Sequence, residues 1–357
     1  MKIKQTIILI VSCLMSVSIV GWLIYDSKDN FIKIWREVST IYLLLALLSS
    51  AVIYVFMGLS LWETLKLLGK RIHLGAAVSI AFVSTTVNYL ISSLGVSGFA
   101  LRAHLLGKRN VPLGTSVMAS IVISVLLYAV LIVIILLGTL LLFLTRGATA
   151  TAEQMGRNFA VMVAIALIGA FITAFFFNNE FRFKSLRNGF RLLNKAVYKI
   201  FGKLIPRTNF SAFEKQFDNG IRTIHDNKSK LTGAIACVCG DWVFTILILY
   251  LAFLAVGVVI PIDVLIAGFA LGMLTTLIPI LPGGLGAMEL AMASVFSQMG
   301  DVPWETALSA ALIYRVVYYI IPGIISVIVY WGLKLSEPAA LTTNRAREYL
   351  RNEAKNQ

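Results

Sequence analysis

Six long runs of apolar residues limit what this chain can fold into. Each run approaches or exceeds the roughly 20 residues that an α-helix needs to cross a hydrocarbon core about 30 Å thick. Charged residues make up only 13% of the chain, about half of the usual share in a soluble domain. The sequence therefore predicts an all-α, polytopic membrane protein with spans in Thr6–Tyr25, Ile41–Leu61, Ser116–Leu144, Ala160–Phe177, Leu231–Val258 and Ala307–Leu333.

Two further apolar stretches are interrupted by residues that break or loosen helices. Residues 75–108 are rich in Ser, Thr, Asn and Gly, and residues 263–301 contain Pro279, Pro282 and several glycines. Proline removes a helix donor and glycine loosens the backbone. We expect each stretch to form a re-entrant helical hairpin, which enters and leaves by the same membrane face. The expected fold has about eight membrane segments, either about six spans with two hairpins or about eight full crossings.

The basic residues predict the orientation of these segments. The net charge is +14, and the excess of Lys and Arg lies between apolar runs, which is typical of membrane topology rather than of nucleic-acid binding. Residues 178–231 hold 12 Lys and Arg against four Asp and Glu. We therefore expect this loop, the N-terminus and the C-terminal tail from residue 336 to be cytoplasmic, in the cell inner membrane.

The two interrupted stretches resemble each other. Leu94-Gly95 lies 17 residues before Val111-Pro112, and Leu285-Gly286 lies 17 residues before Val302-Pro303. The charge pattern inverts the second copy, so the sequence predicts two inverted repeats, at residues 1–145 and 146–335. In transporters with inverted repeats the binding site lies near the membrane midplane, between the repeats.

Three ionisable residues are expected deep in the membrane: Asp241, Glu289 and Arg315. Asp241 lies about 15 Å into its span at 1.5 Å per residue, and Arg315 lies at a similar depth from the other face. Such groups are expensive at depth, so they face a cavity or each other. One interpretation is a structural pair of Arg315 with either Asp241 or Glu289. The other is a single polar cavity that all three residues surround.

Neutral donors and glycines near the breaks are further candidates for ligand binding. A helix that begins after Gly283, Gly284 and Gly286 would direct its N-terminal amides at the midplane, where an anion binds readily. Near the first break, Asn88 could likewise donate hydrogen bonds to an anion, and the base Arg102 lies close by in the sequence. Close helix packing, which small residues favour in membranes, explains these glycines and serines equally well.

A basic, amphipathic segment is expected at the cytoplasmic surface. Apolar residues from Phe183 to Leu204 recur at spacings of three and four, with bases beside them at a spacing of four. This pattern is typical of a helix that lies on an anionic leaflet, although a helix packed on the bundle also fits. The expected surface residues are Arg187, Arg191, Lys195, Lys199 and Lys203.

The motifs that most cofactors and enzymes require are missing from the sequence. There is no GxxxxGK[ST] or GxGxxG loop, no HExxH motif and no catalytic triad pattern. The Cys residues lie inside apolar runs without the CxxC spacing of a zinc site. We therefore expect neither a cofactor nor a bound metal, and no enzymatic activity.

The stretch from Leu277 to Glu289 contains Pro-Gly-Gly-Leu-Gly-Ala-Met-Glu, and Tyr314-Arg315 follows about 25 residues later. These motifs resemble the lysylphosphatidylglycerol synthase transmembrane-region family, which includes the flippase-like part of the multiple peptide resistance factor. Gly283, Gly284, Gly286, Glu289 and Arg315 match its second motif. The family's first motif has a glycine, an acidic residue and then an arginine before the third long span. Gly98 and Arg102 match this motif, but Phe99 stands where the family has the acidic residue.

The resemblance implies a polytopic fold with re-entrant helices and a role in handling lipids. The leading hypothesis is therefore a flippase or scramblase that moves an anionic or headgroup-modified lipid, with anionic membrane lipids as partners. The alternatives are an ion-coupled transporter of small solutes, a transferase of lipid-linked groups, and a non-transporting partner of an envelope enzyme.

Overall fold

The computed structural model describes residues 28–90, 96–146, 228–276, 284 and 286–335, and the single positions 180, 181, 184, 187, 188, 191 and 222. Every regular element in this part of the chain is a helix, as expected. Long apolar helices that can cross a membrane are α3 (Thr40–Leu67), α6 (Leu113–Arg146), α10 (Lys228–Ala255) and the continuous stretch α13–η3–α14 (Trp304–Arg315, Val316–Ile320, Ile321–Leu335). The spans expected at 6–25 and 160–177 lie outside the described residues.

The distribution of side chains is the reverse of that in a soluble protein. Large apolar residues point outward along the long helices, including Leu48 (63% exposed), Val133 (60%) and Ile328 (71%). Asp241, Glu289 and Arg315 are instead buried inside the bundle. A surface of this kind is stable against lipid tails but not against water, which agrees with a polytopic membrane protein.

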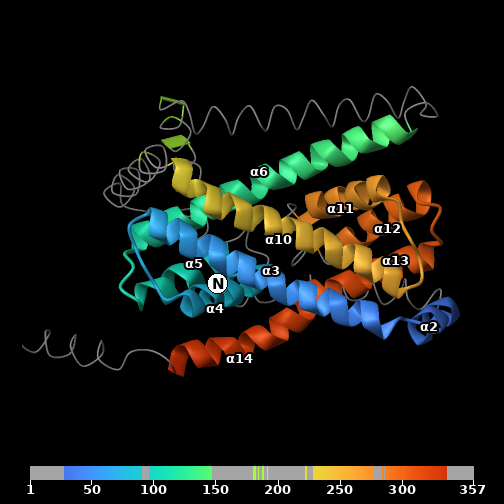
Figure 1. Cartoon of the computed structure of the whole chain (residues 1–357), viewed down its shortest axis with the longest axis horizontal. Helices are drawn as coiled ribbons and strands as arrows, with labels where there is room; N and C mark the ends of the chain where they lie inside the picture. Colours follow the sequence, from blue (N-terminus) through green and yellow to red (C-terminus); the bar gives the residue numbers. More distant parts are fainter. Residues whose placement is uncertain are drawn as a thin grey trace, which may run out of the picture.

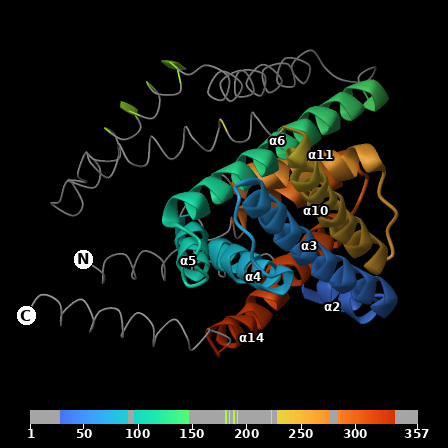
Figure 2. The ribbon, with the colours of Figure 1, turned by 60° about the vertical axis from the view of Figure 1, so that its left-hand side comes forward.

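Helices α3 and α10 form the antiparallel centre of the bundle (Figure 1). The amide of Ser39, just before α3, donates to the carbonyl of Ala255 at the end of α10, at 2.9 Å. Midway along the pair, Gly240 leaves room for the ring of Phe56. Helices α6 and α14 lie on opposite sides of this centre (Figure 2). A short helix that the sequence did not predict, α2 (Lys28–Arg36), packs against α13.

Two pairs of short helices occupy the interrupted stretches. They are α4 (Leu74–Leu90) with α5 (Val96–Gly107), and α11 (Ile262–Thr276) with α12 (Ala287–Met299). At 1.5 Å per residue these helices measure only about 18–26 Å, less than a bilayer core. Within each pair glycine allows close approach: Gly98 lies against the Ser84 carbonyl, and Gly272 lies against Met292.

The two helix pairs open at opposite ends of the bundle. Helix α4 follows α3 directly, so the first pair opens at the C-terminal end of α3. Helix α11 follows α10 directly, so the second pair opens at the C-terminal end of α10, beside Ser39. Helix α6 begins after α5, and Thr145 in its last turn donates to Asp263 of α11 at 2.8 Å. Figure 1 shows the same separation of α4 and α5 from α11 and α12.

Among the described elements, α3–α4–α5 and α10–α11–α12 follow the same order of one long and two short helices. Helices α3 and α10 each contain 28 residues, and the connections at 68–73 and 256–261 have equal lengths. The packing is reciprocal as well, because α4 contacts α14 and α11 contacts α6. Since α3 and α10 are antiparallel, the second set of elements runs opposite to the first.

A π-helical turn, η3, interrupts the last long helix. The amide of Ile321 donates to the carbonyl of Val316, five residues back, and Pro322 has no amide to donate. The carbonyls of Val317 and Tyr318 therefore need other donors. Ser50 and Tyr54 of α3 supply them, each at 3.0 Å. This turn fixes the last helix against the centre of the bundle.

Candidate functional site

Glu289 and Arg315 form a buried ion pair between α12 and α13. The Arg315 Nε atom lies 3.0 Å from Glu289 Oε1, and the two side chains are 4% and 1% exposed. Of the two partners that the sequence left open for Arg315, the structure selects Glu289. Opposite charges at this distance offset part of the cost of burying each one.

Glu289 has a second role at the start of α12. Its Oε2 atom accepts a hydrogen bond from the Gly286 amide at 2.8 Å, in a capping arrangement. Gly284 and Gly286 have φ values of 68° and 83°, which suit glycine far better than other residues. The amide of Gly286, which we expected to bind an anionic ligand, thus binds the protein's own carboxylate. Gly283 lies outside the described residues.

Aromatic and sulfur groups enclose the arginine. Its Cζ atom lies 4.4 Å from the centre of the Tyr319 ring, and Nη1 donates to Met288 Sδ at 3.5 Å. Cation–π contacts are most favourable where water is excluded. Arg315 is therefore held by α12 and η3 together.

A cluster of tyrosines joins this pair to the first helix pair. Tyr89, near the inner end of α4, makes a hydroxyl–hydroxyl hydrogen bond with Tyr318 at 3.0 Å. Its ring also packs on Tyr319, and Tyr314 stacks on Tyr318 at 5.4 Å. Of these tyrosines the sequence singled out only Tyr314. Their positions in mid-span, rather than at the membrane interface where tyrosine is usual, were the available signal.

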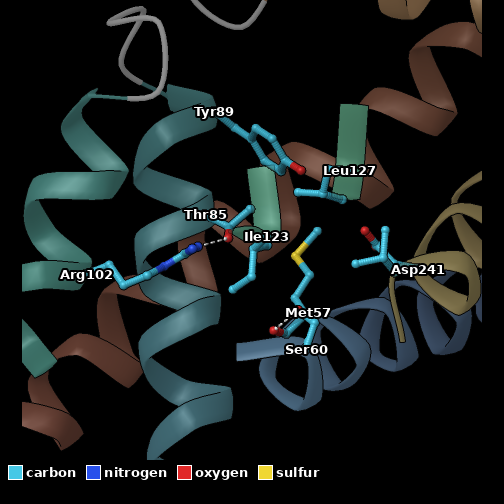
Figure 3. A pocket seen from close by; sticks show the side chains of 9 residues that line it. Met57, Ser60, Thr85, Tyr89, Arg102, Ile123, Leu127 and Asp241 are labelled. Atoms are coloured by element: carbon cyan, nitrogen blue, oxygen red, sulfur yellow. Dashed lines mark hydrogen bonds between the residues drawn. The ribbon is translucent and has the colours of Figure 1, made fainter. Parts of the chain in front are cut away.

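A separate cavity of about 40 Å³ lies between α3, α4, α5, α6 and α10. Arg102 and Asp241 approach it from opposite sides, and Ser60, Thr85 and Tyr89 contribute hydroxyl groups to its wall (Figure 3). The volume is sufficient for water but not for a lipid headgroup. Among the described residues Asp241 lines this cavity, whereas Glu289 and Arg315 do not, so the structure does not place the three around one cavity.

The two charged residues of the cavity are bound very differently. The guanidinium of Arg102 donates to Ser84 Oγ at 3.1 Å and to Thr85 Oγ1 at 3.4 Å. Asp241 is 4% exposed, and its Oδ1 atom has no hydrogen-bond partner. Within the described part of the chain neither residue forms an ion pair. Asn88 lies nearby, its Cβ against Gly98, and its Oδ1 atom is also buried without a partner.

The remaining predicted residues lie at the surface or outside the described chain. Arg187 and Arg191 are exposed and helical, and Lys195, Lys199 and Lys203 lie outside the described residues. Phe99 is half-buried in α5. Among the described residues, no three His, Cys, Asp or Glu side chains group as metal ligands would.

Residues 9–326 match the family described as the lysylphosphatidylglycerol synthase TM region. The chain belongs to this family. Its relatives include UPF0104 membrane proteins from two archaea. One, from Methanocaldococcus jannaschii, is 22% identical over 91% of this chain and 94% of its own length. Another, from Methanothermobacter thermautotrophicus, is 23% identical over 94% of this chain and 98% of its own length.

A shorter match connects the chain to a much longer protein. A phosphatidylglycerol lysyltransferase of Staphylococcus aureus is 36% identical over 90 residues, which are 25% of this chain and 11% of that protein. The match spans a small part of the transferase. It therefore shows similarity over this segment alone, and the transferase activity of that protein is not carried over to this chain.

Proposed function

We propose that this protein is a flippase or scramblase, which moves an anionic or headgroup-modified lipid between the leaflets of the inner membrane. One observation carries the proposal. Two pairs of short helices open at opposite ends of the bundle, and their inner ends meet at buried charges and tyrosines. A path for a headgroup needs polar groups at mid-membrane and access from each face; the buried charges and tyrosines support the first, and the opposed orientation of the two helix pairs supports the second.

In the proposed topology the two pairs are re-entrant hairpins in the inverted repeats 1–145 and 146–335. The pair α4–α5 opens to the cytoplasm and α11–α12 opens to the outside, with both chain termini cytoplasmic. The matched lengths of α3 and α10 and the reciprocal packing of α4 and α11 support this symmetry. Rocking of one repeat against the other would expose the centre to each face in turn.

Anionic lipids are the proposed partners at the cytoplasmic surface. Arg187 and Arg191 are exposed and helical, as a helix that contacts lipid headgroups requires. The excess of bases in the loop 178–231 supports the same interpretation. The lysyltransferase similarity adds aminoacylated phosphatidylglycerol to the candidate cargoes.

Reconstitution of the purified full chain into liposomes tests this function. Each preparation carries one fluorescent lipid with an anionic, zwitterionic or cationic headgroup, and a membrane-impermeant quencher reports the outer leaflet. We expect accelerated exchange for at least one headgroup class, relative to protein-free liposomes. A well-folded protein that exchanges none of the three classes would contradict the proposal, and uptake of a small solute without lipid exchange would favour the solute transporter.

A further inference from the structure

We propose that Asp241 is a proton-binding site, and that its protonation state controls the approach of α5 to α10 across the cavity. The proton-binding part is independent of the proposed function. The part that assigns an energy source, a proton gradient, rests on lipid movement.

The geometry of Asp241 favours a neutral carboxyl in the described conformation. The side chain lies midway along a 28-residue membrane helix and is 4% exposed. Its Oδ1 atom has no hydrogen-bond partner, and no ion pair reaches it from the described residues. A bare carboxylate without a partner is strongly disfavoured in such surroundings, whereas a protonated carboxyl is tolerated.

The cavity can hold water beside the carboxyl. Its volume of about 40 Å³ admits water, and the hydroxyls of Ser60, Thr85 and Tyr89 line it. Water and hydroxyls together can pass a proton to an enclosed carboxyl. Asp241 is the one carboxylate that the described residues contribute to the lining, which is too few anionic ligands for a metal cation, whereas a proton needs only one carboxyl oxygen.

Among the described residues, Arg102 is the one cationic residue that lines the cavity with Asp241, and the other titratable groups near Asp241 are mostly tyrosines. The tyrosines that interact electrostatically with Asp241 are Tyr54 on α3, Tyr89 on α4, Tyr314 on α13 and Tyr318 on η3. Helix α6 presents Ile123 and Leu127 to the cavity. On α11 the one titratable residue is Asp263, in its first turn at the bundle end. Arg315 is already bound to Glu289.

Asp241 can be neutral or negatively charged. The preferred distance between its carboxyl and the Arg102 guanidinium differs between these two states. When Asp241 is protonated, Arg102 stays with the hydroxyls of Ser84 and Thr85, as described here. When the proton leaves to water, the new carboxylate attracts the guanidinium on the opposite wall (Figure 3). Because Arg102 is part of α5, the attraction draws the first helix pair toward α10 and closes the cavity. A proton gradient thereby acts on the first helix pair, which is part of the first of the two repeats proposed to rock against each other.

Infrared titration of the purified full chain tests proton binding without any transport. We expect a high-frequency band of a buried, protonated carboxyl in the natural protein, with loss of that band in Asp241→Asn. Asp301→Asn is the matched control, because Asp301 is exposed in the turn between α12 and α13. Thermal unfolding checks that both variants fold, and the amide that Asp241→Asn introduces imitates the neutral carboxyl. A band that survives in Asp241→Asn, or no such band in the natural protein, overturns the proposal.

Movement of α5 is measured by a distance between two spin labels, at the exposed positions Ala100 in α5 and Val243 in α10. We expect a shift of this distance with pH in the natural sequence, and loss of the shift in both Asp241→Asn and Arg102→Gln. A shift that persists in both variants overturns the coupling. In liposomes, lipid exchange that ignores an imposed pH gradient would reject the energy source alone, whereas a titrating carboxyl without any lipid exchange would reject the proposed function alone.

Discussion

The ion pair between Glu289 and Arg315 makes a quantitative prediction about stability. Arg315→Gln leaves a carboxylate that is 1% exposed without its counter-ion, which costs about 3–5 kcal/mol. Glu289→Gln leaves the Arg315 guanidinium buried without its counter-ion. Because the cation–π contact with Tyr319 remains and contributes roughly 1 kcal/mol, the expected loss of stability is about 2–4 kcal/mol. The double change removes both charges and leaves only imperfect hydrogen bonding, at about 1–2 kcal/mol.

The double variant should therefore be more stable than either single variant, and the single losses together should exceed the double loss by at least about 3 kcal/mol, which is the coupling free energy. Equilibrium unfolding in mixed micelles of a mild detergent and dodecyl sulfate measures all four proteins. Glu63 and Lys66 provide the matched control, because this pair is 3.9 Å apart and partly exposed. Its coupling should not exceed about 0.5 kcal/mol. A Glu289–Arg315 coupling no larger than that of the control pair would refute the reasoning.

Leaflet exchange by the same double variant separates two roles of the arginine. If Arg315 also binds headgroups, the double variant should be stable but unable to move lipid. Full exchange by a stable double variant would restrict the pair to holding α12 against α13. The path for the headgroup would then lie nearer to Arg102 and Asn88.

Three further predictions concern packing, topology and the surface. Gly98→Leu should destabilise the fold by about 1–3 kcal/mol, because the new side chain would meet the Ser84 carbonyl. Gly107→Ala is the control, because Gly107 has open space around it. Equal unfolding midpoints for the two variants would contradict the close packing at Gly98. In a background without native cysteines, Arg71→Cys should react with an impermeant thiol reagent only from the cytoplasm and Val259→Cys only from outside, so labelling from one common face would reject the opposed openings. Arg187→Glu should change the free energy of unfolding by no more than about 0.5 kcal/mol, because the residue is exposed. The same change should weaken binding to anionic liposomes at low salt. A large loss of stability would instead mean that this segment packs on the bundle.

The sequence by itself determined which segments are long membrane helices and which are interrupted. Apolar length is a local property, so α3, α6, α10 and the α13–α14 stretch appear where the expected spans within the described residues lie. The glycine and proline breaks likewise marked the two short pairs to within a residue or two of their ends. The matched 17-residue spacings also predicted two inverted repeats, which stays a prediction.

The sequence also predicted the depth of the buried charges but left their partners open. The rise of 1.5 Å per residue places Asp241 and Arg315 at similar depths, yet depth does not say toward which neighbour a side chain points. That direction depends on how each helix is rotated in the bundle, and rotation is set by packing between segments far apart in the chain. Only the tertiary structure therefore assigned Arg315 to Glu289, placed Asp241 opposite Arg102, and joined Tyr89 to Tyr318. The π-turn has the same origin, since Pro322 signals a break but Ser50 and Tyr54 of another helix satisfy the carbonyls that it leaves free.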